Sequence, residues 1–431
     1  MTLLFRIPKN HVQRFELHNE VHARAPIKLP LPVRATHIAL LLSHEDRTIE
    51  NKHLAALCER FAYPAPKSDI AQFNADFDSF QLRWEQHHEF STYTFYTPGN
   101  QQDDPFANPA LKKVPVDWLA GLPGEIIVAA HGCITSRSKE DPDIDNFSAY
   151  FTDNTIIGGK MSGAAAIAFT DFRIHVDGFS RFLILDRGLR PQQAGRLLQR
   201  LFEIEVYRVM ALLALPVVRQ LIPKLNAADQ QLLDITTTMS QADCNDAELL
   251  EELTQLAVKI ENHISSTHFR TNGASAYYQI VMSRIEDLRE VRIQGIQTID
   301  EFMKRRLEPA INTCQSTAKR LSRLSERISN AGQLLRTRVD ITIERQNQAL
   351  LASMDRRAKL QLRLQETVEG LSIVAITTYI ASLIRSISKA MQSYGIAIEP
   401  DQVVGLAILP IILIVAFIVR RIHIMIKKPN K

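Results

Sequence analysis

Two histidines four residues apart, His18 and His22, are the first side chains in this sequence that could do chemistry together. Positions i and i+4 of a helix lie on one face, so the two imidazoles could share a zinc ion. The zinc metalloprotease pattern, however, needs a glutamate directly after the first histidine to act as general base. Asn19 occupies that position here, and Glu20 would point elsewhere on a helix. The pair is a candidate metal site, and a structural or hydrogen-bonding role is the favoured alternative.

A second group of polar side chains lies in the stretch "TDFRIHVDG". Asp171, Arg173, His175 and Asp177 alternate with apolar residues there, which predicts a strand with one charged face and one buried face. The pair Asp177-Gly178 favours a type I′ hairpin turn, because both central residues of that turn need positive φ. The charged face is a candidate site for a polar ligand, and a solvated or salt-bridged sheet face is the alternative.

Two further patterns resemble catalytic or phosphate-binding motifs, but each lacks residues that the motif requires. His131 and Cys133 in "HGCITS" have the residue types of a nucleophile and its base, but no third residue that would orient them is evident, and a buried cysteine is expected. Gly158 and Gly159 in "TIIGGKMSG" lack the spacing and the terminal Lys-Ser/Thr pair of a phosphate-binding loop. We therefore assign no catalytic residue, expect no cofactor, and predict that the protein is not an enzyme.

The composition of the 431 residues, 45% apolar and 23% charged, is that of a folded protein. The net charge of +4 is unevenly distributed, since residues 1–267 carry 26 basic and 33 acidic residues whereas residues 268–366 carry 18 and 11. The four cysteines are far apart in sequence, which favours a reducing compartment. The first residues do not resemble a secretory signal. Positive charge that gathers toward the C-terminus points to an anionic partner such as a lipid surface, and we expect no nucleic acid.

Two apolar segments dominate the last sixty residues. Residues 370–384 carry no charge, and residues 403–419 are apolar at 15 of 17 positions. Extended to about 370–390 and 403–422, each is long enough for a membrane-spanning helix, with Pro410 expected to kink the second. A buried helical hairpin in a soluble core is the alternative reading. We expect a two-span hairpin in the lipid bilayer.

The flanking charges predict how the hairpin is oriented. Basic residues cluster before the first segment at 356–363 and after the second at 420–431, whereas the connecting loop, about 392–402, carries only Glu399 and Asp401. The positive-inside rule then places both termini in the cytoplasm and the short loop outside. Arg385 and Lys389 near the outer end are the exceptions. We expect the inner, or plasma, membrane of a bacterium.

The rest of the chain predicts an α+β protein in which an N-terminal α/β head precedes long helices. Strand-like runs begin near residues 35, 89, 125 and 164, and 48–61 is typical of a helix. Helices are expected from 191 to 215, ending at Pro216 and Pro223, and near 245–265 and 274–308. Residues 310–366, with one glycine and no proline, predict a single stalk helix about 85 Å long. The expected domains are a head (1–188), a helical domain (189–308), a stalk (309–367) and the hairpin with its basic tail (368–426, tail to 431).

At several places the sequence is similar to the bacterial domain-of-unknown-function 3422 family. The segments "ELHNEVHARAP", "VDWLAGLPGE", "TDFRIHVDGFSRFLILDRGL" and "LLRTRVDITIERQNQALLASMDRRAKLQLRLQETVEGLSIVAI" carry the resemblance. The family pattern reads Glu-x-His-Ala-Arg-Pro near the start, whereas here Ala25 separates Arg24 from Pro26. The resemblance covers nearly the full length and implies a membrane-anchored protein, with no activity attached.

The order of head, stalk, two spans and basic tail also resembles CorA-type magnesium channels. That family ends its first span in Tyr-Gly-Met-Asn, and here Tyr394 and Gly395 are followed by Ile396 and Ala397. Tyr394, Gly395, Glu399 and Asp401 are therefore the candidate residues of an ion-entrance loop. In a pentamer of that kind, hydroxyls of the first span would line a pore, unless they bond back to their own helix.

Three functions thus remain open. The first is a membrane-anchored scaffold or regulatory protein that forms a homo-oligomer through its stalk and binds protein partners of unknown identity. The second is a cation channel or transporter component. The third is a membrane-tethered enzyme that uses the histidine and aspartate residues of the head.

Overall fold

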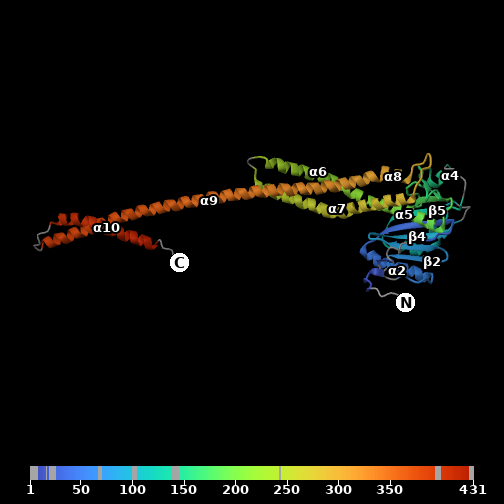
Figure 1. Ribbon diagram of the computed structural model, residues 1–431, viewed down its shortest axis with the longest axis horizontal. Coiled ribbons are helices and arrows are strands. Elements are labelled where there is room, and N and C mark those ends of the chain that lie inside the picture. The colour runs from blue at the N-terminus through green and yellow to red at the C-terminus, as the bar shows by residue number, and fades with distance from the viewer. Residues whose placement is uncertain are drawn as a thin grey trace. The chain divides into compact units, whose positions relative to one another are not determined.

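The computed structural model describes residues 8–15, 17–18, 26–66, 70–99, 104–137, 145–241, 244–393 and 399–426. The described chain divides into two compact units. The first comprises residues up to Cys244 together with Glu251–Gly332, and the second comprises Asn245–Leu250 and the residues from Gln333 onward. The predicted α+β class is confirmed, since a sheet precedes a series of long helices (Figure 1). The predicted domain boundaries stay a prediction.

The first unit is built on one eight-stranded sheet with the order β2-β3-β4-β1-β5-β8-β7-β6. Its strands are β1 (Val33–Leu41), β2 (Gln72–Asp76), β3 (Gln81–Gln86), β4 (Phe90–Pro98), β5 (Glu125–Ile134), β6 (Ile157–Met161), β7 (Ala166–Thr170) and β8 (Ser180–Asp186). All neighbouring strands are antiparallel except β5 and β8, which are parallel. The strands predicted from the runs near residues 35, 89 and 125 are therefore present as β1, β4 and β5.

Helices cover both faces of this sheet. Helix α2 (His44–Arg60), which was predicted as 48–61, packs Leu54 and Leu57 against Ile38 and Leu40 of β1. A capping box at Ser43 fixes its start. The next residue of β1, Ala39, faces the other way and packs against helix α5 (Pro191–Leu212). This alternation along β1 places a separate apolar core on each face of the sheet.

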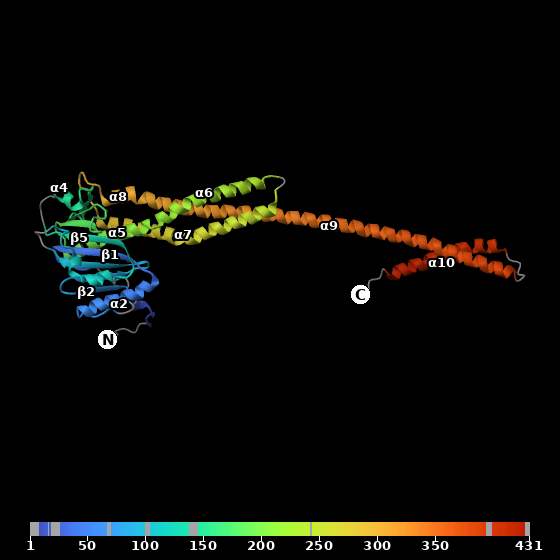
Figure 2. The same ribbon diagram turned by 180° about the vertical axis from the view of Figure 1, so that it is seen from behind.

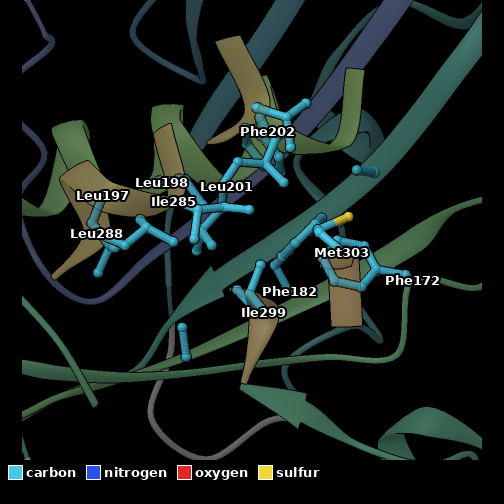
Figure 3. Close-up of a cluster of buried hydrophobic side chains, with 14 of the residues drawn as sticks. Phe172, Phe182, Leu197, Leu198, Leu201, Phe202, Ile285, Leu288, Ile299 and Met303 are labelled. Atoms are coloured by element: carbon cyan, nitrogen blue, oxygen red, sulfur yellow. The ribbon is translucent and has the colours of Figure 1, made fainter. Parts of the chain in front are cut away.

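Helix α5 packs closely on the sheet at a glycine. A Cβ added at Gly132 of β5 would lie 2.6 Å from Leu198 Cδ1 and 2.9 Å from Phe202 Cζ, so a larger residue here would have to displace these two side chains. Helices α7 (Asp246–Leu288) and α8 (Ile299–Arg306) complete the same core. Figure 3 shows Leu197, Leu201 and Phe202 of α5 beside Ile285 and Leu288 of α7, Ile299 and Met303 of α8, and Phe172 and Phe182 from the sheet side.

Long helices form the remainder of the first unit. Helix α6 (Ala214–Met239), α7 and the first part of α9 (Glu308–Ser393) run side by side in both views (Figures 1 and 2). Asp229 of α6 accepts hydrogen bonds from Arg320 (3.0 Å to its Nε) and Arg327 (3.0 Å) of α9. Together with buried Leu225, Leu232, Leu321 and Leu324, these contacts fix the bundle.

The helix boundaries differ from the prediction in three places. The break falls at Leu213, and α6 contains both Pro216, in its first turn, and Pro223. The two helices predicted near 245–265 and 274–308 are one helix, α7, followed by a loop and the short α8. Asn272 and Gly273 lie between the predicted pair and favour a helix end, but α7 continues through them. The predicted stalk helix is confirmed and continues as α9 to Ser393.

The second unit contains the later part of α9 and helix α10 (Pro400–Ile426). Two helical windows are long and apolar enough to cross a membrane, with mean hydropathy of 1.6 in 299–392 and 2.9 in Pro400–Ile422. The two helices lie side by side (Figure 2), with Thr377, Ser388, Val404 and Val415 buried and Arg385 paired with Asp401 at 2.9 Å. Helix α10 continues through Pro410.

Candidate functional site

A pocket lined by polar and apolar side chains lies between the sheet and helix α5. It is lined by His37, Arg83, Glu85, Tyr96, Glu203 and Tyr207, among others, and we call it the His37 pocket. The strand register explains the grouping, because His37 of β1 is paired with Thr94 of β4, which in turn is paired with Arg83 of β3. The cavity of about 20 Å³ has room for one water-sized molecule. The pocket is therefore a place where a small polar group can be held inside the head.

His37 is the central side chain of this pocket. It is 6% exposed, its Nδ1 lies 2.8 Å from the hydroxyl of Thr94, and its ring stacks on Phe202 with centroids 4.8 Å apart. Burial lowers the pKa of His37 to about 3, so the imidazole is neutral at neutral pH. Within the described part of the chain, its Nε2 is buried and has no hydrogen-bond partner. An unsatisfied ring nitrogen beside a water-sized cavity is the feature that makes this pocket a candidate binding site.

An ion pair forms the sheet side of the pocket. Arg83 Nη2 lies 2.8 Å from Glu85 Oε1, and the two side chains are 2% and 13% exposed. Burial alone would raise the pKa of Glu85, but the hydrogen bond and charge of Arg83 outweigh it and lower that pKa. Burial also raises the pKa of Tyr96 to about 12, so its phenol keeps its proton. The sheet side therefore offers a fixed pair of charges and neutral hydroxyl groups.

Helix α5 supplies the opposite side of the pocket with Gln199, Phe202 and Glu203. Gln199 Nε2 donates to Glu203 Oε1 at 2.8 Å, and Arg284 of α7 pairs with the other carboxylate oxygen of Glu203. Each negative charge in the pocket thus has a basic partner, and the site as a whole is close to neutral. Such a site suits a small uncharged ligand that donates or accepts one hydrogen bond.

The predicted charged strand face at 171–177 is not a strand. Strand β7 ends at Thr170 and β8 begins at Ser180, because Phe172 takes a left-handed φ of 52° and Asp171 Oδ1 accepts from the backbone N–H of Arg173 at 3.2 Å. This local side-chain bond replaces the sheet ladder. The predicted type I′ turn is also wrong: the turn closes from Gly178 N–H to the carbonyl of His175 at 2.9 Å, and only Gly178 of the Asp177-Gly178 pair takes a positive φ.

The loop nevertheless brings two of the four predicted residues together. His175 Nδ1 lies 3.1 Å from the hydroxyl of Thr152, and its Nε2 lies 3.0 Å from Asp171 Oδ2, which also accepts from Asn154 at 2.8 Å. The hydroxyl of Thr152, the imidazole of His175 and the carboxylate of Asp171 are thus in the order of a nucleophile, its general base and the group that orients the base. The Nε2–H bond, however, is not aligned with the carboxylate, so no hydrogen bond joins them. These contacts hold the loop between β7 and β8 in place, but the hydrogen bond between the base and the orienting carboxylate that a catalytic triad needs is absent.

The other two residues of that group lie apart from this contact. Arg173 is exposed, and Asp177 forms an ion pair with Arg181 at 3.0 Å. That pair lowers the pKa of Asp177 against the opposing effect of burial. The ligand-binding role of the four residues stays a prediction, and their common strand face is excluded.

The remaining predicted residues are placed as follows. His18 is exposed, and His22 lies outside the described residues, as do Tyr394 and Gly395. Glu399 and Asp401 lie at the start of α10. Within the described ranges, no three His, Cys, Asp or Glu side chains are grouped so that they could hold a metal ion.

The histidine and cysteine of β5 have separate surroundings. His131 Nδ1 lies 2.9 Å from the hydroxyl of Thr36, and its ring stacks on Phe179, whereas Cys133 packs among Phe151 and Phe169. Burial raises the pKa of Cys133 to about 11, which keeps it a thiol. Cys133 is thus a buried core residue, as expected from the sequence.

Comparison with known proteins bears on the whole chain. A family model described as "Protein of unknown function (DUF3422)" matches residues 9–426. No curated protein and no solved structure matches the chain. Because the family match extends over nearly the full length, it confirms the resemblance found in the sequence: the protein belongs to the DUF3422 family of proteins of unknown function.

Proposed function

We propose that this protein is a membrane-anchored scaffold or regulatory protein that self-associates through helix α9 and presents its head in the cytoplasm. The observation that carries the proposal is the exposure of apolar side chains along α9 and α10. Leu371, Leu406, Leu409, Leu413 and Phe417 are each 65% exposed or more. Apolar area of this kind is unfavourable in water by about 25 cal/mol per Å², and lipid removes that cost.

The flanking charges support the proposed orientation. Arg356, Arg357, Lys359 and Arg363 precede the first apolar segment, and Arg420 and Arg421 follow the second. The opposite end of the hairpin carries Asp401, which pairs with Arg385 and neutralises one of the two basic residues there. By the positive-inside rule, the end bearing Arg356 and Arg420 faces the cytoplasm of a bacterial inner membrane.

An apolar stripe on α9 supports self-association. From 340 to 368 every side chain of this helix is exposed in the single chain. The stripe consists of Val339, Ile343, Leu350, Met354, Leu364 and Val368, whose spacings of four, seven, four, ten and four residues put them on one face. A helix without tertiary contacts is marginally stable in water, so this segment needs a partner.

A second copy of the same chain fits that need. Copies anchored by the same hairpin enter the membrane in one direction, which sets their α9 helices parallel and in register. Gln346, Arg357 and Gln361 interrupt the stripe, and polar residues at such positions specify register in coiled coils. We therefore infer a parallel coiled coil over 339–368.

The channel hypothesis receives less support from the contacts. Asp401 is paired with Arg385, so the proposed entrance loses one of its two negative charges. Thr378 donates to the carbonyl of Ala375 at 2.9 Å, and Thr377 is buried and donates to Ile373 at 2.7 Å. These hydroxyls are satisfied by their own helix rather than by a pore.

Cysteine cross-linking in membranes tests the proposal. The background carries Cys244→Ser, because Cys58, Cys133 and Cys314 are already buried. Leu350→Cys, on the stripe, is expected to form a disulfide between copies on mild oxidation. Gln348→Cys, on the opposite face of the same turn, is the matched control and is expected to stay monomeric. Equal cross-linking at both positions, or none at either, contradicts self-association through the stripe.

A further inference from the structure

The outer half of the first apolar segment carries a polar ridge. Thr378, Ser382, Arg385 and Lys389 are spaced by four, three and four residues, so they follow one side of α9. All four are exposed in the single chain, whereas the side packed on α10 carries the buried Thr377 and Ser388. Charged side chains that face lipid are costly, so they are expected to have partners.

One of the two charges has its partner within the chain. Arg385 Nη2 lies 2.9 Å from Asp401 Oδ1 across the hairpin. This pair fixes the position of α9 relative to α10 along their common axis, because it joins a residue two turns before the end of α9 to the first turn of α10. The neighbouring charges lie beyond this pair on the loop side: Lys389 is one turn further along α9, and Glu399 precedes Asp401 by two residues.

Lys389 and Glu399 are thus opposite charges at matching depth. Both are exposed, and across the residues that the structure describes neither takes part in an ion pair. The loop residues between them, 394–398, contain no acidic or basic side chain. The loop that joins the two helices therefore offers neither charge an oppositely charged side chain.

We propose that Lys389 of one copy pairs with Glu399 of the adjacent copy, so that the loop end of the hairpin is a second contact between copies. The proposal rests on the proposed function, since it requires parallel copies in one membrane. Two chains inserted in the same direction hold identical residues at the same depth, which brings the lysine of one to the height of the glutamate of the next. The pair then neutralises both remaining charges of the hairpin end, and it fixes which side of α9 faces the neighbour.

A mixed cross-linking experiment tests the contact directly. Full-length chains that carry Lys389→Cys or Glu399→Cys, each in the Cys244→Ser background, are expressed together in membranes with different tags. A disulfide-linked pair that contains both tags is expected. The control replaces Lys389→Cys by Met391→Cys, which lies two residues further along α9 on the opposite side of the helix, and it is expected to give about fivefold less product.

Charge reversal supplies the second readout. Lys389→Glu and Glu399→Lys are each expected to lower cross-linking through Leu350→Cys about fivefold, and the double variant is expected to restore it. Resistance of each variant to alkaline extraction shows that the hairpin is still inserted. If Leu350→Cys cross-links while the mixed pair does not, or if the double variant is no better than the single ones, this contact is excluded and the proposed function stands. If Leu350→Cys itself fails to cross-link, the proposed function fails first.

Discussion

At the scale of single residues, His37 couples the stability of the head to pH. Burial lowers its pKa from 6.5 to about 3, so the folded state favours the neutral form of the His37 side chain. A base with a lowered pKa stabilises the fold above its unfolded pKa and loses that contribution as the pH falls below it. As the pH falls from about 6.5 to about 3, the free energy of unfolding therefore decreases progressively, because His37 takes up a proton in the unfolded state but not in the folded state.

Replacing His37 by phenylalanine tests this coupling. His37→Phe keeps the stack on Phe202 and removes the group that must be deprotonated. Between pH 7 and pH 4.5 the wild type is expected to lose about 2–3 kcal/mol that the variant keeps. The measurement is the midpoint of unfolding in detergent at the two pH values. His88→Phe, the same change at an exposed histidine of the adjacent β3–β4 hairpin, is the control, and an identical pH response of wild type and His37→Phe would disprove the argument.

The His37 pocket shows why a site can be absent from a sequence reading. His37 sits inside the apolar run of β1, and the alternation of Arg83 and Glu85 in "LRWEQ" is visible but common on sheet faces. What makes the site is that β1, β3, β4 and α5 meet there, and Glu203 is more than 160 residues from His37. The buried Glu50, which accepts hydrogen bonds from Trp84, Ser91 and Tyr93, was missed for the same reason.

At the scale of elements, the start of α5 is fixed by a backbone contact that only glycine allows. A Cβ at Gly195 would lie 1.9 Å from the carbonyl oxygen of Ile27, and the neighbouring Leu29 N–H donates to the carbonyl of Pro191 at 3.1 Å. The segment around residues 27–29 is therefore held against the first turns of α5. Any side chain at residue 195 must push the two apart.

Gly195→Ala is accordingly expected to destabilise the protein by about 1–3 kcal/mol, the usual cost of overpacking. Gly273→Ala in α7 is the matched control, since its Cβ would meet nothing nearer than Tyr277 Cε2 at 3.7 Å. That change should be neutral or should stabilise α7 by up to about 1 kcal/mol. Urea unfolding in detergent measures both, and similar effects from the two substitutions would show that the contact with Ile27 is unimportant.

The elements that sequence reasoning recovered are those with a strong period or a strong stop signal. The helix at 48–61 and the stalk helix have helical spacing, and β1, β4 and β5 are β-rich runs between turn residues. The strand expected at 171–176 failed, because alternation alone does not reveal that Asp171 bonds to its own backbone. The break expected between 265 and 274 failed because α7, which is packed in the core at Ala274, continues through Asn272 and Gly273 although these residues favour a helix end.

At the scale of the whole molecule, the two apolar helices are unequal in hydropathy, and we expect them to be unequal as anchors. The window in α10 has a mean hydropathy of 2.9 against 1.6 for that in α9, and α9 also carries Arg385 and Lys389. Without α10, Arg385 would lose Asp401 as its partner. The first segment alone is thus expected to hold the chain in a membrane only loosely.

A chain that ends at residue 398 tests this inequality. It is expected to be released by alkaline carbonate from membranes that retain the full-length protein. Replacing 400–426 by a leucine-alanine helix of equal length should restore retention, because a strong second span is again present. Retention of the shortened chain at the level of the full-length protein would show that the first segment is a sufficient anchor.

If the two apolar helices span a membrane as proposed, the ion pair between Arg385 and Asp401 has a consequence for how they are inserted. Inserted alone, the first segment would carry Arg385 into the membrane without its counter-charge. Its mean hydropathy of 1.6 provides only a moderate driving force for that insertion. Once α10 has been synthesised, the same cation enters together with its counter-charge. The two helices are therefore expected to partition into lipid in one step, and biogenesis of this protein is expected to depend on a translocase that accepts helical pairs.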